Sequence, residues 1–192
     1  MNKINTLYLV FLCLISCTTS PEVITNTSGI SLDLAQYRKG QVSKVIYDLS
    51  FYIPKQKERP IPSKLKLSVT ISDLTNPLYL DFKETSKKLQ LLSVNEQIIE
   101  IQHELEHLII PKEYLVLGQN KIIIDFIAGD LSLNRNDDYL YTLLVPDRAR
   151  TLFPCFDQPN IKAIFNLSVR VPKEWTVIGG AQLNTRINDG VN

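Results

Sequence analysis

Alternation of apolar and polar residues restricts this chain to β-structure. The clearest run is residues 65–72, where Leu, Val or Ile at every second position is separated by Lys, Ser or Thr. Successive side chains of a strand point to opposite faces, so such a run indicates a strand with one buried face. Further strand candidates, with turn signals between them, are residues 45–53, 78–82, 89–94, 98–110, 122–128, 139–145, 164–171 and 175–182.

One short helix is indicated near the start, at residues 31–38, with Asp33 in its first turn and Gly40 just past its end. Strands at this spacing indicate an all-β fold. We therefore predict an antiparallel multi-strand sandwich or saddle with a single short helix near the start.

The first residues are typical of an export signal. Lys3 supplies a positive charge, and residues 7–15 form an apolar run too short to span a bilayer. The run ends in Leu-Ile-Ser-Cys17, which resembles a bacterial lipobox; a plain secretory signal cut nearby is the alternative. We predict a lipoprotein signal peptide at residues 1–16, lipidation of Cys17, a tether at residues 17–28 and an exported protein anchored to a membrane of the bacterial cell envelope.

Composition describes an ordinary soluble domain after the signal. The chain carries 21 basic and 20 acidic residues, and this net charge of +1 gives no reason to expect nucleic acid as a partner. It has only two histidines and no other cluster of metal-ligand type, so little material for hydrolytic chemistry is present.

A block of aromatic residues and prolines follows the predicted strands. Pro154 and Pro159 fix φ and bias the residue before each toward extended backbone, so we expect a rigid turn. Asp157 lies between them and can accept hydrogen bonds from backbone N–H groups or pair with Arg150. The signature consists of Arg150, Phe153, Pro154, Cys155, Asp157 and Pro159.

The thiol of Cys155 is left without an intrachain partner if Cys13 leaves with the signal and Cys17 carries lipid. No motif supplies this thiol with a base. We therefore interpret Cys155 as a small buried hydrophobe rather than a nucleophile.

The block closely resembles the signature that ends the N-terminal β-domain of zinc aminopeptidases of the aminopeptidase N type (gluzincins). The resemblance extends to Asp33-Leu-Ala-Gln-Tyr-Arg, to residues 111–120 with Leu115, Gly118 and Asn120, and to Pro172-Lys-Glu-Trp-Thr-Val. It implies that residues 29–192 form such a domain, which caps the substrate cleft while other domains hydrolyse peptides. In the full-length family enzyme, a zinc-bound water with a Glu as general base would attack the peptide bond next to a free N-terminus.

The catalytic motifs of that family are not carried over. A G-x-M-E-N segment, which binds the amino end of the substrate, is absent because the only methionine is Met1. An H-E-x-x-H does occur, from His103 and Glu104 to His107, but the third zinc ligand of the family, nineteen positions further on, is replaced by Phe126. The match also lies upstream of the proline block, whereas the zinc helix of the family lies downstream.

Geometry decides whether the two histidines can share a metal. Residues four apart lie about 6 Å apart along a helix but roughly 13 Å apart along a strand. The spacing of apolar residues at 98–110 fits either a helix or a strand. The frequent Ile residues and Pro111, which would end the element, favour a strand. We interpret His103, Glu104 and His107 as a chance match in a β-region, and we predict no catalytic residue, no metal ligand and no cofactor in this chain.

The segment before the block is the candidate contact with substrate. In the family, the strand before Arg-x-x-Phe-Pro-Cys lines one wall of the active-site cleft, and a Glu or Gln five positions before the Arg binds the substrate's amino group. That position is Val145 here, so the resemblance implies only an apolar wall contact. Asp147, Arg148 and Arg150 could also contact substrate, but we favour the interpretation of this segment as a solvated turn braced by an Arg150–Asp157 pair.

The C-terminal end predicts an incomplete domain. Residues 175–182 read as a strand, and Asn-Asp-Gly190 is a hairpin-turn signal with only two residues after it. We expect the N-terminal portion of a longer aminopeptidase that removes N-terminal amino acids from peptides. Its partner would be peptide substrate bound with the missing catalytic domain, and this chain alone would be non-catalytic. The alternative is a stand-alone β-sandwich lipoprotein that acts as a binding module.

Overall fold

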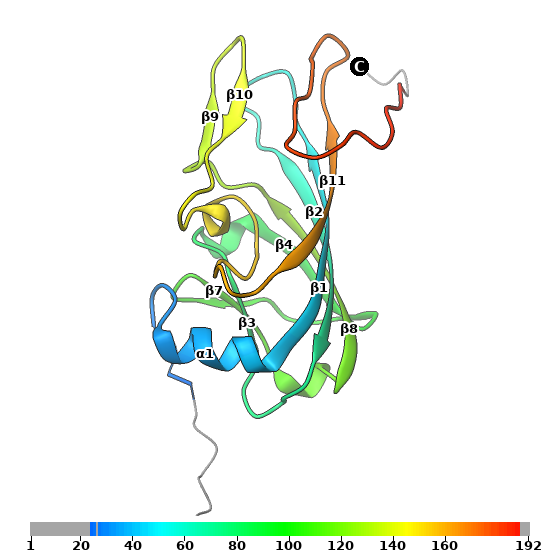
Figure 1. The fold of residues 1–192 in the computed structure, drawn as a ribbon. Coiled ribbons are helices and arrows are strands. Elements are labelled where there is room, and N and C mark those ends of the chain that lie inside the picture. Colours follow the sequence, from blue (N-terminus) through cyan, green and yellow to red (C-terminus); the bar gives the residue numbers. More distant parts are fainter. Residues whose placement is uncertain (1–23, 26, 189–192) are drawn as a thin grey trace, which may run out of the picture.

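A six-stranded sheet is the largest element of the computed structural model, which describes residues 24–25 and 27–188 (Figure 1). The strand order is β11-β1-β2-β8-β4-β5, and neighbouring strands are antiparallel except for β1 and β11, which are parallel. The strands are β1 (Val42–Tyr52), β2 (Pro62–Ile71), β4 (Leu89–Val94), β5 (Gln97–Ile98), β8 (Gly118–Ile127) and β11 (Ala163–Arg170).

Two smaller sheets and one helix complete the described fold. The three-stranded sheet has the order β3-β7-β6, and β9 and β10 form a separate hairpin, which projects at the top of Figure 1. These elements are α1 (Leu32–Gln41), β3 (Leu78–Asp81), β6 (Gln102–Glu104), β7 (His107–Ile110), β9 (Leu133–Arg135) and β10 (Leu140–Thr142). Short 3-10 turns are η1 (Ser86–Lys88), η2 (Lys112–Tyr114) and η3 (Ala149–Thr151).

The core contains the alternating residues that the sequence singled out. Leu65, Leu67, Val69 and Ile71 of β2 are all buried, and the polar residues between them face outward. Apolar residues of β3 and β7 belong to the same core cluster, so the two sheets share one hydrophobic core. The predicted all-β class with one short helix is confirmed, with the parallel β1–β11 pair as the departure from an all-antiparallel arrangement.

One predicted strand, residues 98–110, is wrong as a single element, because β5, β6 and β7 replace it. Chain reversal between β6 and β7 uses Leu105 and Glu106, both with positive φ (48° and 71°). This is the backbone of a two-residue type I′ hairpin, which usually carries Asn or Gly. The turn was missed because neither residue gives that signal.

The helix is longer than predicted. Ser31 accepts a hydrogen bond from the backbone N–H of Leu34 at 3.1 Å and caps its start. The helix then continues to Gln41, so Gly40 lies inside it rather than past its end.

Near the C-terminal end, the predicted strand at residues 175–182 is wrong. No strand is assigned in the described chain after β11. The Asn-Asp-Gly190 turn falls largely outside the described residues.

The predicted signal peptide and lipidated Cys17 lie outside the described residues. Part of the predicted tether is described, and it packs on the domain: Ile24 is buried and its N–H donates to Asn76 Oδ1 at 3.1 Å. Within residues 24–25 and 27–188, no helix has the length and apolar character needed to cross a membrane.

Gly129 lies where the chain passes close to η3, and this gives a test of the packing. A Cβ at this position would fall 1.8 Å from the backbone oxygen of Thr151. We predict that Gly129→Ala lowers the free energy of unfolding by about 1–3 kcal/mol, since the backbone must shift. Denaturant unfolding measures this, with Gly179→Ala, whose Cβ would meet nothing within 4 Å, as control. Equal effects of the two substitutions would contradict the prediction.

Candidate functional site

The H-E-x-x-H segment forms the β6–β7 hairpin instead of a zinc-binding helix. Glu104 pairs with His107 across the hairpin, and His103 pairs with Leu108. The Nε2 atom of His103 lies 2.8 Å from the carbonyl oxygen of Phe82, to which it donates in the matching tautomer. The predicted β-conformation of this segment is therefore confirmed.

His107 is fully buried, and both of its ring nitrogens face oxygen atoms. Nε2 lies 2.9 Å from the carbonyl oxygen of Gly29, and Nδ1 lies 3.0 Å from Oδ1 of Asp81. A zinc ion needs a free lone pair on an imidazole nitrogen that is directed at an open position. The ring of His107 offers no such position, because its two nitrogens are occupied within the fold.

Asp81 is the centre of a buried polar network. Its Oδ1 accepts a hydrogen bond from Arg38 Nη1 at 2.7 Å, and its Oδ2 accepts one from the backbone N–H of Asp157 at 2.9 Å. The side chains of Arg38 and Asp81 are both completely buried. Burial acts to raise the pKa of Asp81, but the hydrogen bond from His107 and the charge of Arg38 outweigh it, so this pKa lies below its ordinary value.

The guanidinium of Arg38 joins the helix to the proline block. Its Nε donates to Oε1 of Gln158 at 2.7 Å, and its Nη1 also donates to the carbonyl oxygen of Tyr79. The ring of Phe156 lies 5.8 Å from the guanidinium carbon, within range of a cation–π contact. The Asp33-to-Arg38 motif therefore contributes a structural arginine to the buried network.

Arg150 ties the candidate wall segment to the β6–β7 turn. Its side chain is largely buried; Nη1 donates to Glu106 Oε2 at 2.6 Å and Nη2 donates to Asp147 Oδ2 at 2.8 Å. Burial acts to lower the pKa of Arg150, but the pairs with Asp147 and Glu106 outweigh it and raise this pKa. Arg150 is thus held as a cation within the fold.

The expected Arg150–Asp157 brace exists in a different form. The backbone N–H of Arg150, rather than its guanidinium, donates to Asp157 Oδ2 at 3.0 Å. Burial is the main reason that the pKa of Asp157 lies above its ordinary value. The sequence indicated both roles of Asp157, and the structure selects the acceptor of a backbone hydrogen bond.

Val145 lies in the loop between β10 and η3, and its side chain is 75% exposed. Tyr139, Tyr141 and Leu143 precede it at every second position and are also exposed. The two tyrosine rings lie 6.0 Å apart. We call Tyr139, Tyr141, Leu143 and Val145 the apolar ridge. Val145 was predicted as a wall contact, whereas Tyr139 and Tyr141 were not, although the apolar alternation along residues 139–145 was a signal for them.

Cys155 is buried, and its backbone forms a bridge with Asp81: Asp81 N–H donates to the Cys155 oxygen at 2.7 Å. Burial raises the pKa of the Cys155 thiol well above its ordinary value. A thiol in that state stays protonated, and protonated thiols are poor nucleophiles. This environment agrees with the interpretation of Cys155 as a packing residue.

Asn120, from the second matching motif, is also completely buried. Its Oδ1 accepts from the Val116 N–H at 2.9 Å, and its Nδ2 donates to the Val116 oxygen at 2.7 Å. Gly118, with φ of 99°, completes the turn that Asn120 holds. These motif residues shape a loop and leave no group free for chemistry.

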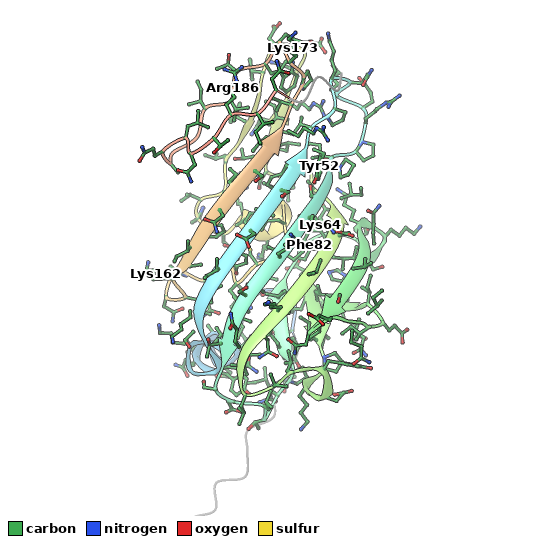
Figure 2. All side chains as sticks on the ribbon, turned by 90° about the vertical axis from the view of Figure 1, so that its right-hand side faces the viewer. Tyr52, Lys64, Phe82, Lys162, Lys173 and Arg186 are labelled. Carbon is green, nitrogen blue, oxygen red and sulfur yellow. The ribbon has the colours of Figure 1, made fainter. Side chains whose placement is uncertain are left out.

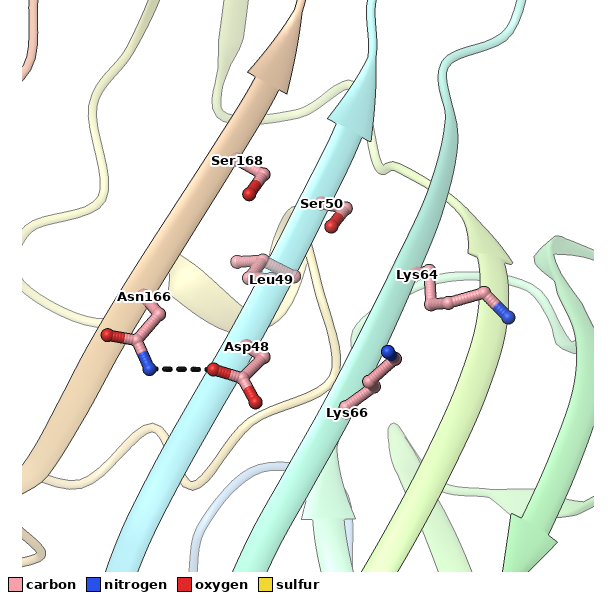
Figure 3. Close-up of a pocket in the computed structure, with 7 residues that line it drawn as sticks. All are labelled: Asp48, Leu49, Ser50, Lys64, Lys66, Asn166 and Ser168. Carbon is pink, nitrogen blue, oxygen red and sulfur yellow. Dashed lines mark hydrogen bonds between the residues drawn. The ribbon is translucent and has the colours of Figure 1, made fainter. Parts of the chain in front are cut away.

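A shallow hollow of about 280 Å³ lies on the outer face of the six-stranded sheet (Figure 3). It is lined by Asp48, Leu49, Ser50, Lys64, Lys66, Asn166 and Ser168. Asn166 Nδ2 donates to Asp48 Oδ1, and Lys64 pairs with Asp125 at 2.6 Å. The lining contains no residue of the ridge or of the matched motifs. Within the described ranges, no cluster of three or more His, Cys, Asp or Glu side chains is placed to hold a metal ion.

Comparison with known sequences identifies the region that carries the motifs. Residues 43–191 match the family described as the Peptidase M1 N-terminal domain. Aminopeptidase A of Gloydius brevicauda is 25% identical over 205 aligned positions, which cover 89% of this chain and 21% of that protein. Aminopeptidase N of Streptomyces lividans is 50% identical over 44 positions, covering 22% of this chain and 5% of that protein. The chain therefore spans about a fifth or less of these two relatives.

Solved structures show the same fold. An M1 zinc metallopeptidase from Deinococcus radiodurans superimposes with a TM-score of 0.58 at 18% identity, covering 78% of this chain and 37% of that chain. Leukotriene A4 hydrolase from Saccharomyces cerevisiae also gives 0.58, at 21% identity, covering 69% of this chain and 23% of that one. At these identities the likeness establishes the fold alone.

The contribution of the Asp81 network to the stability of the fold can be tested by substitution. We predict that Asp81→Asn lowers the free energy of unfolding near neutral pH by roughly 3–5 kcal/mol, because it leaves the buried Arg38 without its counter-charge. The folded-state pKa of Asp81 is depressed, so its contribution is present above the ordinary aspartate value near 3.8 and is lost as pH falls through the lower folded value.

Denaturant unfolding from pH 7 to pH 2 checks both parts of that prediction. The variant should show a smaller loss of stability on acidification than the parent. Asp130→Asn is the matched control, since the side chain of Asp130 is 81% exposed in its pair with Lys88. A loss at Asp81 no larger than at Asp130 would show that the network does not hold the fold.

Proposed function

Because the chain belongs to the family of Peptidase M1 N-terminal domains, we propose that it is the cleft-capping domain of a zinc metallo-aminopeptidase. The complete enzyme would remove N-terminal amino acids from peptides. This chain would supply part of the cleft wall, and the remainder of the protein would supply the chemistry.

The apolar ridge supports this proposal. It presents aromatic and aliphatic side chains to solvent on the segment that precedes Arg150. Exposed, neighbouring apolar side chains on a soluble protein mark contact surfaces. The two ion pairs of Arg150 fix the base of the segment, so the ridge has a defined position before any partner arrives.

The described residues do not fit a zinc site. His103 and His107 occupy a hairpin and engage carbonyl and carboxylate oxygens, as set out above. The zinc ligands and the catalytic groups would therefore lie in the rest of the protein. The stand-alone binding module is not favoured, since the family match runs through most of the chain.

The reading frame downstream of the gene tests the proposed function. A frame that encodes G-x-M-E-N and a second H-E-x-x-H, followed by a Glu, is the expected result. A stop codon directly after the codon for Asn192, followed by unrelated genes, would instead favour a separate binding protein.

For chemistry, we predict that the purified chain neither binds zinc stoichiometrically nor releases amino acids from aminoacyl reporter substrates. The reason is that both ring nitrogens of the buried His107 face oxygen atoms of the fold, and the hairpin register places His103 and His107 on opposite faces. Equilibrium dialysis against zinc and a peptidase assay measure these two properties, with His103→Ala beside the parent. Sub-micromolar zinc binding that His103→Ala abolishes, together with peptidase activity, would make His103 and His107 a real site.

We also propose that the protein is exported and anchored to a membrane through lipid on Cys17. We predict that it fractionates with membranes and that Cys17→Ser releases it without changing the thermal unfolding of the domain. Two acyl chains at one cysteine suffice for stable anchoring, at about 0.8 kcal/mol per buried methylene. Metabolic lipid labelling and fractionation measure this. Labelling that persists in Cys17→Ser would contradict the assignment, and Cys13→Ser is the control.

A further inference from the structure

His107 is a buried titratable side chain that the proposed function leaves unused. It lies on β7, whose sheet is behind the six-stranded sheet in the view of Figure 2. Nε2 of the ring lies 2.9 Å from the carbonyl oxygen of Gly29 and 3.1 Å from that of Thr27, and Nδ1 lies 3.0 Å from Asp81 Oδ1. All three distances are within hydrogen-bond range, so both ring nitrogens face oxygen atoms.

These three oxygen atoms are acceptors. Backbone carbonyl oxygens only accept hydrogen bonds. Asp81 is ionised at neutral pH, because its pKa lies below its ordinary value, and its Oδ1 also accepts from Arg38 Nη1 at 2.7 Å. A neutral imidazole carries one N–H and one lone pair, so either tautomer would direct a lone pair at an oxygen atom. The doubly protonated ring, the imidazolium cation, matches all three oxygen atoms.

The groups around the ring are suited to a cation. Charged and titratable side chains near it come from every packed element: Asp81 and Tyr79 of β3, Arg38 of α1, Glu104 of β6, Glu106 of the hairpin turn, and Asp157, whose N–H binds Asp81. The closest is the carboxylate of Asp81. Arg38 and an imidazolium at His107 would share this carboxylate, and the two backbone carbonyl oxygens supply further negative partial charge.

The two carbonyl oxygens belong to the segment that leads into α1. Gly29 has φ of 78°, in the left-handed region that glycine adopts readily. This turn brings the oxygen atoms of residues 27 and 29 to the same ring nitrogen. Ser31, which caps α1, follows directly. His107 therefore fixes the chain immediately before the helix whose Arg38 binds Asp81.

We propose that His107 is a charged latch, which holds residues 27–29 against the β6–β7 hairpin as an imidazolium and releases them when the ring loses its second proton. A neutral ring would keep its one N–H at Asp81, because a hydrogen bond to an ionised group is stronger than one to a carbonyl oxygen. The lone pair of Nε2 would then face the carbonyl oxygens of residues 27 and 29. Opening frees the segment before α1 and leaves the Arg38–Asp81 pair closed.

Nitrogen NMR of the imidazole ring tests the charge. In the parent at pH 7, both ring nitrogens of His107 should show the 15N shifts of protonated nitrogen, and a His103→Phe variant assigns the signals. A shift typical of a bare lone pair at either nitrogen would overturn the proposal. As pH is raised, the backbone order of residues 27–29 should fall in the interval in which the ring loses its second proton. Order that persists on the neutral ring would also overturn it.

Backbone 15N relaxation tests the latch. Order parameters of Ser28 and Gly29 should be about 0.85 in the parent and below about 0.6 in His107→Phe, which keeps a ring but has neither charge nor N–H. His103→Phe is the matched control, because the His103 ring contacts the carbonyl oxygen of Phe82 instead of the segment. Unchanged order parameters in β2 would show that the loss is local.

A second variant loosens the segment without altering the buried ring. Gly29→Ala disfavours the left-handed backbone that directs the carbonyl oxygens, while its Cβ would meet nothing within 4 Å. It should lower the order of residues 27–29 as His107→Phe does, and it tests the latch even where His107→Phe does not fold. Gly40→Ala, inside α1 and equally free of contacts, is the control. A segment that stays ordered in Gly29→Ala, or that loosens equally in Gly40→Ala, would overturn the proposal.

Discussion

The fold depends on one buried ion pair, between Arg38 and Asp81. Burying two charges costs several kcal/mol each, so the pair is stable only where further hydrogen bonds satisfy both groups. Those bonds come from distant parts of the chain: His107 from β7, and the Asp157 N–H and Gln158 side chain from the proline block. The rigid turn between Pro154 and Pro159 has a physical purpose here, because it delivers the last two partners at fixed positions.

The same constraint explains the histidine motif. His107 lies in the network, and Glu106 beside it receives the guanidinium of Arg150. Burial acts to raise the pKa of Glu106, but the hydrogen bond from Lys83 and the charge of Arg150 outweigh it and lower this pKa. The second histidine of the metal-like motif is therefore a structural tie to the Arg38–Asp81 pair, and its neighbour Glu106 ties the hairpin to the candidate wall.

Sequence reasoning located most strands because alternation reports one buried face, as in β2 and β8. It failed where the structure of a segment depends on a neighbouring strand, or the role of a residue on a side chain distant in sequence. Residues 175–182 have the composition of a strand, but strand propensity acts only through packing and pairing, and the described chain gives this segment no neighbouring strand. The role of Arg38 was equally hidden, since its partner lies 43 residues away and no local pattern connects them.

The candidate wall segment shows a second limit of sequence reasoning, which grouped residues together but could not separate their roles. The family resemblance placed Val145, Asp147 and Arg150 in one functional segment, and the structure divides their roles: Val145 is exposed, whereas Arg150 holds the segment from beneath through Asp147 and Glu106. Arg150 and Glu106 stay ionised at neutral and mildly acidic pH, because one pKa is raised and the other lowered. The brace therefore persists over that range, and the exposed side chains that follow β10 are held on a fixed base at Arg150.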